Sequence, residues 1–453
     1  MEGFSGHTRI LVDSIKRLMR RGALGNLKKI INKSHAADLS VIFRSLSIDQ
    51  QLKIFHMIDE KEKQGILLSE LDKDSFLYLT KEMSIQSLID IFEFIPSDDL
   101  ADLIAKLPNE TADKVLEGMR KENSQEVEDL LRYDDKTAGG IMVPDFYALQ
   151  ADNSAQEAIS SLQKEHKDVE MPFYLYVIDE FDRLVGVCSL RQLVVVKPDT
   201  PLKDFMSVNV LSVRTDMDQE EVAKIVARYD ILAVPVVDES HKLVGIITVD
   251  DVIDIIREEA TEDILKMVGA GEEFIETKSI LGSIRSRLPW LFASWLGGIM
   301  AFFIIGHYEN ALKNLAYLAA FIPIIMGMGG NVGTQSSTIV VRGIATGRIN
   351  IRDISSVVIK ELSVGGLLGV FYGLLLGTVA IGKYNILMLG IVVGSSVLSS
   401  MTIAALVGSF VPMVLARVHI DPAIATGPFV TTSIDILSVY FYFQIAMILL
   451  GLS

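Results

Sequence analysis

The sequence predicts a multidomain protein in which an acidic, soluble region of α-helical and α/β structure precedes an all-α membrane region. Residues 1–280 carry a net charge of −20, whereas residues 281–453 carry +4. Half of the 453 residues are hydrophobic and the mean hydropathy is +0.37, which excludes a disordered chain. Cys188 is the one cysteine, so no internal disulfide and no Cys/His zinc cluster can form. The acidic region is also a poor partner for nucleic acid.

Five long apolar segments predict membrane-spanning helices. Each exceeds the roughly 20 residues that a helix needs to cross a bilayer, and Asp435 is the one formally charged residue among them. The segments are 288–308, 314–341, 362–382, 384–416 and 422–453. Because a soluble domain could not cover a core of this size, buried soluble helices are disfavoured.

The charges between these segments predict their orientation. Seven basic residues flank one face of the membrane, against two on the other, Lys313 and Lys383. Basic residues concentrate on the cytoplasmic side. We therefore expect a multi-pass protein of the cell (inner) membrane with its N-terminus in the cytoplasm and its C-terminus outside. No apolar run lies near Met1, so we expect no cleaved signal peptide.

Residues 25 to about 133 predict a stack of short helices that is similar to a solenoid. Polar breaks separate the helices, and segment 95–102 is echoed twelve residues later by segment 107–113. Both begin with proline followed by acidic residues, which suits the first turn of a helix. The basic run 9–33 has helical spacing, and a solvated helix face is favoured there over contact with anionic lipid.

An internal repeat lies between Met142 and Ile256. The pattern of residues 177–187 returns 59 residues later at 236–246. Each copy predicts a strand, an Asp-rich turn, a strand containing glycine, and a helix capped by Ser189 or Thr248. The repeat resembles paired CBS domains, whose two copies pack into one module. This resemblance implies a sensor of a small ligand, often an adenine nucleotide, and leaves open whether ATP binds.

A strip of carboxylates follows the repeat. Residues 216–263 hold fourteen acidic and four basic side chains. Asp251, Asp254 and Glu258 are spaced i, i+3 and i+7, with Glu262 one turn further, so they share one face of a helix. The strip lies immediately before the membrane region. Hard oxygen ligands in that position favour binding of Mg²⁺ or Ca²⁺ over a merely solvated surface.

Two motifs in the membrane region predict different roles. The first is a set of four glycines spaced four residues apart, which predicts a smooth ridge for close helix packing. These are Gly365, Gly369, Gly373 and Gly377. The second is segment 328–337, which places amides and hydroxyls around three glycines at membrane depth. Such groups must be satisfied by protein, water or a hydrated ion, so we expect this segment to line a cavity.

Asp435 predicts an ion site. If the last helix begins at Pro428, Asp435 lies seven residues, or roughly 10 Å, inside it. A lone carboxylate at that depth is costly, and no Lys or Arg lies within the predicted segments to pair with it. We therefore expect Asp435 to face water, a proton or a cation.

The whole arrangement resembles the MgtE family of magnesium transporters and channels. Segments 329–336, 421–423 and 428–432 and Asp435 are similar to the family's most specific motifs. The resemblance implies a helical superhelical N-domain at 1–136, CBS domains at 137–200 and 201–257, an acidic connecting (plug) helix at 258–283, and a five-helix pore domain at 284–453. It also implies a homodimer in membrane lipid, with a pore formed by spans two and five of both subunits.

The resemblance further implies functional residues. Asp435 would bind the ion in the pore, whose lining would include Gly329, Gly330, Asn331, Gln335 and Thr431. Regulatory metal ions would bind a set of acidic residues outside the pore. These are Asp98, Asp102, Asp218, Glu220, Asp230, Asp251, Asp254, Glu259, Glu262, Asp263 and Asp421. The neighbouring Asp99 leaves the register of the first pair open.

We therefore expect a Mg²⁺-selective, channel-like transporter, not an enzyme, that imports Mg²⁺ down its electrochemical gradient. Cytoplasmic Mg²⁺ would close it. No Walker-type phosphate-binding motif and no catalytic constellation stands in the sequence. Two alternatives stay open, a proton- or sodium-coupled divalent cation carrier and a CBS-bearing membrane sensor without transport. The choice among Mg²⁺, Co²⁺, Mn²⁺ and Ca²⁺ also stays open.

Overall fold

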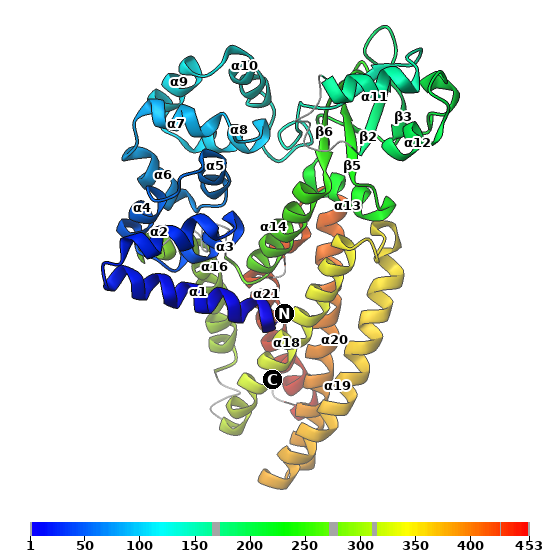
Figure 1. Cartoon of the computed structure of the whole chain (residues 1–453). Coiled ribbons are helices and arrows are strands. Elements are labelled where there is room, and N and C mark those ends of the chain that lie inside the picture. Colours follow the sequence, from blue (N-terminus) through cyan, green and yellow to red (C-terminus); the bar gives the residue numbers. More distant parts are fainter. Residues whose placement is uncertain (1, 165–172, 271–279, 310–314, 426, 452–453) are drawn as a thin grey trace. The chain divides into compact units, whose positions relative to one another are not determined.

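The computed structural model describes residues 2–164, 173–270, 280–309, 315–425 and 427–451. The chain divides into two compact units, Met1–Glu258 and Glu259–Ser453, which are described separately below (Figure 1). The first unit contains the N-terminal helices and both copies of the repeat. The second contains the end of helix α14 and the membrane helices.

Helices α1 to α10 form the predicted solenoid-like stack. They are α1 (Glu2–Arg20), α2 (Leu24–Lys33), α3 (Ala36–Arg44), α4 (Ile48–Phe55), α5 (Lys61–Ser69), α6 (Lys73–Lys81), α7 (Ile85–Phe92), α8 (Ser97–Lys106), α9 (Asn109–Gly118) and α10 (Lys121–Leu130). Alternate helices pack on one another, α3 on α5, α5 on α7 and α7 on α9. The prolines of the two echoed segments, Pro96 and Pro108, are the N-cap residues of α8 and α9. They therefore lie one residue before the first turn, in which the sequence predicted them.

The internal repeat folds into two similar α/β halves. The first comprises β1 (Ala148–Gln150), α11 (Ala155–Lys164), β2 (Tyr174–Ile178), β3 (Leu184–Ser189) and α12 (Leu190–Val195), followed by the short η1 (Leu202–Asp204). The second comprises β4 (Val213–Arg214), α13 (Gln219–Tyr229), β5 (Ala233–Val237), β6 (Leu243–Thr248) and α14 (Val249–Met267). In each half a parallel strand pair is extended by an antiparallel hairpin, in the orders β1-β2-β3 and β4-β5-β6.

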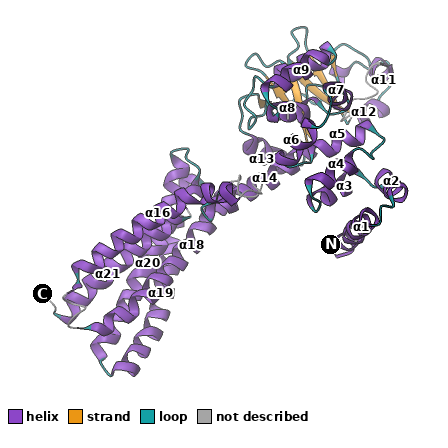
Figure 2. Ribbon diagram, turned by 90° about the vertical axis from the view of Figure 1, so that its left-hand side faces the viewer, coloured by secondary structure: helices purple, strands orange, loops and turns teal. Residues whose placement is uncertain are grey.

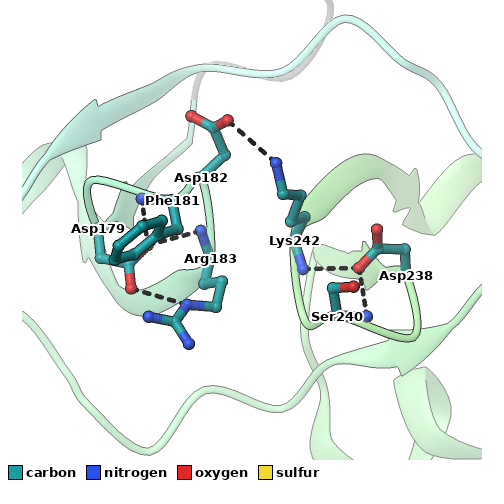
Figure 3. A network of polar contacts seen from close by, with 7 residues as sticks. All are labelled: Asp179, Phe181, Asp182, Arg183, Asp238, Ser240 and Lys242. Atoms are coloured by element: carbon teal, nitrogen blue, oxygen red, sulfur yellow. Dashed lines mark hydrogen bonds and ion pairs between the residues drawn. The ribbon is translucent and has the colours of Figure 1, made fainter.

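The hairpin turns of the two halves lie side by side (Figure 3) and are joined by hydrogen bonds. In each turn one aspartate carboxylate accepts two backbone N–H groups, Asp179 from Phe181 and Arg183, and Asp238 from Ser240 and Lys242. The backbone N–H groups of Leu184 and Leu243 donate across the junction to the carbonyl oxygens of His241 and Asp182. Donors and acceptors are each 59 residues apart. The repeat in the sequence therefore becomes a pseudo-symmetric pair in space.

Helix α14 differs from the predicted connecting helix. It begins at Val249, inside the predicted second CBS domain, and continues without a break to Met267. Thr248 ends strand β6, and its Oγ1 donates to Asp251 Oδ2 at 2.5 Å. Ser189 caps α12 as predicted. Residues 271–279 of the predicted connecting segment lie outside the described residues.

Five helices of the second unit are long and apolar enough to cross a membrane, as predicted (Figure 2). They are α16 (Ile280–His307), α18 (Ile322–Ala345), α19 (Ile354–Tyr384), α20 (Leu387–Arg417) and α21 (Pro428–Leu450), joined by short turns η2 (Ala316–Phe321), η3 (Ile351–Asp353) and η4 (Pro422–Ala425). Helix α20 packs against α18, α19 and α21 and is therefore the centre of the bundle. The helices extend beyond several apolar segments because charged residues at their ends still fit helical structure.

The four-residue glycine ridge lies between α19 and α20, as the spacing predicted. A Cβ atom on Gly369 would come within 2.9 Å of the Leu398 Cα, and one on Gly377 within 2.8 Å of the Gly390 carbonyl oxygen. Glycine is required here because the two helix backbones are almost in contact.

Candidate functional site

Asp435 lies beside an open stretch of backbone on the neighbouring membrane helix. Its helix α21 begins at Pro428, as the sequence predicted, and the Asp435 side chain is partly exposed. The Asp435 Oδ1 is 3.9 Å from the point that a Cβ atom on Gly330 of α18 would occupy. No described residue forms an ion pair with this carboxylate. The pair of Asp435 and Gly330 thus leaves room beside a negative charge, which suits a hydrated cation.

Two residues of α18 that were predicted to line the pore carry exposed amide side chains. Asn331 and Gln335 are one helical turn apart and both exposed, which is unusual for amides on an apolar helix. Thr431 of α21 is partly exposed, and its hydroxyl donates to the Pro428 carbonyl oxygen at 3.2 Å, so its remaining capacity is to accept. These three side chains offer polar groups on the two helices that carry Gly330 and Asp435.

Gly329, which was predicted to line the pore, is packed against two other helices of the same chain. It is buried, and a Cβ atom there would collide with the hydroxyl of Ser400 and come within 2.9 Å of that of Ser438. Within this chain, Gly329 therefore allows α18 to pack closely against α20 and α21.

Glu361 is a carboxyl group that the sequence interpretation missed. The predicted third segment began at residue 362 because the charged pair Lys360 and Glu361 interrupted the apolar run. The corresponding candidate span extends over Ile351–Tyr384 and therefore includes Glu361, which lies one residue before the predicted segment. The Glu361 side chain is buried and accepts a hydrogen bond from Ser336 Oγ at 2.8 Å. The apolar residues 357–359 that precede the charged pair were the signal that could have revealed it.

In the predicted regulatory region of the first unit, Asp99 of α8 is influenced by the charge of Asp251. Asp98 and Asp99 lie in the first turn of α8, Asp102 follows in the next turn, and Asp251 is in the first turn of α14. Loss of solvation by the surrounding protein, then the charges of Asp251 and Asp102, raises the pKa of Asp99 to about 6, although Asp99 is exposed at the surface. Burial is also the largest cause that raises the pKa of Asp102 and of Asp251. Asp99, which the sequence left ambiguous, is thus the N-domain acid most strongly affected by Asp251.

Other predicted regulatory acids have local partners. Asp218 is the N-cap of α13 and accepts from the Glu220 backbone N–H at 2.8 Å. Glu220 pairs with Lys224 at 2.8 Å, and Asp254 pairs with Arg257 at 3.0 Å. These interactions explain why the sequence has carboxylates at those positions without requiring a metal.

Asp230 ends α13 in the left-handed conformation and is exposed. Glu259 and Asp263 lie further along α14. Within the described ranges, no group of three or more His, Cys, Asp or Glu side chains is arranged to hold a metal ion.

Lys266 joins two of the predicted metal ligands in the second unit. Its Nζ contacts the carboxylate of Glu262, one turn earlier on α14, and lies 2.7 Å from Asp421 Oδ2. Burial lowers the pKa of Lys266, but hydrogen bonds and charges from Asp421 and Glu262 outweigh it and the net direction is upward. The other oxygen of Asp421 accepts the Ala423 backbone N–H at 2.8 Å. An internal ammonium group therefore bridges two carboxylates that were each predicted to be regulatory metal ligands.

The same junction contains a close backbone contact. Gly269, just after α14, has a φ of +72°, and a Cβ atom on it would come within 2.9 Å of Pro428 Cδ. A Cβ atom on Gly427 would come within 3.3 Å of the Gly269 nitrogen. The end of α14 is thus packed on the beginning of α21, the helix that carries Asp435.

Comparisons with known proteins match the whole arrangement. Residues 322–445 match the MgtE family, described as divalent cation transporters, and residues 34–136 match the MgtE intracellular N domain. Residues 138–199 and 202–258 match CBS domains. The magnesium transporter MgtE of Thermus thermophilus is 35% identical over 97% of this chain and 98% of its own length. The magnesium transporter MgtE of Bacillus subtilis is 33% identical over 95% of each chain.

One solved structure is similar to the soluble region. It is the cytosolic domain of the Mg²⁺ channel MgtE in complex with ATP, with 34% sequence identity and a TM-score of 0.51. The match covers 54% of this chain and 99% of that chain.

Proposed function

Because this chain is a multi-pass membrane protein that belongs to the MgtE family of divalent cation transporters, we propose that it imports Mg²⁺ through a channel-like pore in which Asp435 binds the ion. The observation that carries this proposal is the placement of Asp435, partly exposed beside Gly330 inside a membrane helix. A carboxylate in an apolar span is costly unless a cation or water offsets it. The names of the relatives support Mg²⁺ as that cation.

The transported ion would keep most of its water. Mg²⁺ dehydrates reluctantly, and proteins usually bind it through one or two carboxylates and several waters. Asp435 supplies the charge, and the amides of Asn331 and Gln335 can hydrogen-bond to the water shell. These groups face away from the core of a single chain, so a second copy would complete the pore. We therefore include a homodimer, with α18 and α21 of both subunits around the ion path.

Transport would need no coupled energy source. In the proposed orientation residues 1–283 lie in the cytoplasm and the C-terminus outside, in the cell's inner membrane. Each 100 mV of inside-negative potential then contributes roughly 4.6 kcal/mol to the entry of a divalent ion. That gradient is sufficient to drive Mg²⁺ inward.

The acidic residues of the soluble region would sense cytoplasmic Mg²⁺. The raised pKa values of Asp99, Asp102 and Asp251 indicate that their ionised forms are disfavoured where they lie. Without metal, like charges would repel and loosen this region, and bound Mg²⁺ would draw it together. Bridging a few such carboxylate pairs would exceed the roughly 5.5 kcal/mol that moves a two-state equilibrium from 1:99 to 99:1. The CBS pair would be the place for ATP, since the similar cytosolic domain of the Mg²⁺ channel MgtE was solved in complex with ATP.

Uptake into proteoliposomes tests the proposed transport. The purified protein should carry Mg²⁺ into vesicles that hold an inside-negative potential, and Co²⁺, Mn²⁺ and Ca²⁺ should be measured in turn under the same conditions. Uptake that requires an imposed pH or sodium gradient would instead favour a coupled carrier. Ligand binding without any uptake would favour a membrane sensor.

A further inference from the structure

We propose that Ser400, on a helix that contributes no predicted pore residue, is a positioning residue that fixes α18 against α21 at the Asp435 site and thereby sets its ion selectivity. This inference rests on the proposed function, because it concerns the ion that Asp435 binds. Its basis is a buried pair of hydroxyls that joins three helices one turn from the site.

The hydroxyls of Ser400 and Ser438 link three membrane helices by hydrogen bonds. Ser400 Oγ of α20 donates to the Ile325 carbonyl oxygen of α18 at 3.2 Å. The Oγ atoms of Ser400 and Ser438 are 2.7 Å apart. Either hydroxyl of this pair can be the donor. A serine hydroxyl has a single proton, so when that of Ser400 is on the Ile325 carbonyl oxygen, Ser438 of α21 donates to Ser400. The result is a directed chain from α21 through α20 to α18.

The hydroxyl pair is enclosed, so water cannot replace it. Ser400 and Ser438 are 1% and 2% exposed. Gly329 closes the space from the third side, because a Cβ atom there would collide with the Ser400 hydroxyl. Polar groups in this environment gain little by separating, since each would lose its partner without finding another.

The two linked hydroxyls lie close to both residues of the proposed ion site, Asp435 and Gly330. Ser438 lies three residues after Asp435 on α21, and Gly329 is adjacent to Gly330 on α18. Both sides of the Asp435 and Gly330 pair are therefore held by the same residue of α20. A site that discriminates between hydrated ions needs its groups fixed within a fraction of an ångström. Removing the Ser400 hydroxyl should let α18 and α21 shift and relax that discrimination.

The test compares Ser400→Ala with a matched control on the same helix. Ser396 is equally buried at 1% exposure, but its Oγ donates to the Val392 carbonyl oxygen of its own helix at 2.7 Å. Uptake of Mg²⁺ and of Co²⁺ is measured in proteoliposomes for the wild type, Ser400→Ala, Ser438→Ala, the double variant and Ser396→Ala. The Mg²⁺:Co²⁺ ratio should change by about threefold to twentyfold in Ser400→Ala, the range that interhelical hydrogen bonds in membranes span.

The controls separate the possible results. Ser438→Ala should change the ratio similarly, the double variant should add little to either single change, and Ser396→Ala should keep the wild-type ratio. Because Ser400 and Ser438 share one hydrogen bond, their effects on the midpoint of thermal unfolding in detergent should also be non-additive. An unchanged ion ratio in Ser400→Ala, or additive effects on unfolding, would overturn the inference. A wild-type protein without divalent uptake would overturn the proposed function instead, and the unfolding measurements would still decide whether the hydroxyl chain joins the helices.

Discussion

At the scale of single residues, the membrane helices hold two carboxyl groups in contrasting surroundings. Glu361 is buried and accepts a hydrogen bond from Ser336, so its polar group is satisfied within the chain. Asp435 is partly exposed beside Gly330, and no described residue offers it an ion pair. This contrast favours Asp435 as the residue that meets the transported ion. The sequence predicted Asp435 from its apolar context but missed Glu361, because a charge at the end of an apolar run looks like a boundary.

Asp99 predicts a pH dependence of the soluble unit. Its pKa of about 6 in the folded chain lies above the ordinary value of 3.8, so the folded state retains a proton that the unfolded chain releases. Protonated Asp99 therefore contributes its full stabilisation when the pH is below 3.8, the pKa of Asp99 in the unfolded chain. This stabilisation is lost as the pH rises through about 6, the pKa in the folded chain. We expect the metal-free, full-length protein in detergent to resist protease better at about pH 5 than at about pH 7.5.

A substitution distinguishes the titration of Asp99 from that of the other carboxyl groups. Asp99→Asn should weaken the pH difference, because the amide carries no charge at either pH, whereas Asp113→Asn on the exposed face of α9 should leave it unchanged. Added Mg²⁺ should protect the wild type at about pH 7.5, when the carboxylates are ionised. Equal protease resistance at both pH values in the metal-free wild type would refute the argument.

At the scale of secondary-structure elements, the glycine ridge of α19 predicts a position-specific packing defect. A Cβ atom on Gly377 would approach the Gly390 carbonyl oxygen to 2.8 Å, and backbone cannot move aside as a side chain can. Gly377→Ala should therefore lower the unfolding free energy by about 1–3 kcal/mol. Gly366→Ala, on the same helix but 3.9 Å from its nearest neighbour, is the control and should be tolerated. Similar thermal midpoints for the two variants in detergent would argue against the ridge.

From the position of Lys266 we predict that its ion pairs stabilise the junction of α14 and α21 in the absence of metal. Its ammonium group lies between Glu262 and Asp421, so Lys266→Gln would leave two carboxylates facing each other. Their repulsion should loosen the junction and raise Mg²⁺ uptake at low cytoplasmic-side Mg²⁺ by roughly tenfold, the effect of one charge-assisted hydrogen bond. High Mg²⁺ should suppress uptake again by taking the place of the ammonium group.

The control for this prediction is Lys224→Gln, which breaks an exposed pair with Glu220 on α13. It should leave uptake unchanged at every Mg²⁺ concentration, since exposed pairs contribute little. If Lys266→Gln behaves like Lys224→Gln, the ammonium bridge does not hold the junction.

The elements that the sequence predicted best are those with strong periodicity. The five spans, the repeated strands and the short N-terminal helices follow from apolar runs, alternation and capping residues. The spacing of the acidic residues from Asp251 to Glu262 predicted one helix there, and α14 runs from Val249 to Met267, across the predicted boundary between the second CBS domain and the connecting helix. Charge does not end a helix, and the apolar residues Val252 and Ile255 anchor its first turns in the soluble core.

At the scale of the whole molecule, the order of domains was predictable but the ligand sets were not. Composition separates the acidic soluble region from the apolar region, and the repeat identifies the CBS pair within the former. Which carboxylates meet depends on tertiary contacts, so spacing alone could not show that Lys266 bridges Glu262 and Asp421 or that Asp99 is affected by Asp251. The assignment of regulatory metal ligands therefore stays a prediction.

Mg²⁺ uptake by Asp435→Asn shows whether the Asp435 carboxylate binds the transported ion. The amide keeps the shape of the side chain but removes the charge, so it separates ion binding from packing. We expect wild-type protein to take up Mg²⁺ into proteoliposomes under an inside-negative potential, and Asp435→Asn and Asp435→Ala to take it up at least about tenfold more slowly while keeping the wild-type thermal midpoint. Full Mg²⁺ flux with unchanged selectivity in Asp435→Asn would show that the Asp435 carboxylate does not bind the transported ion.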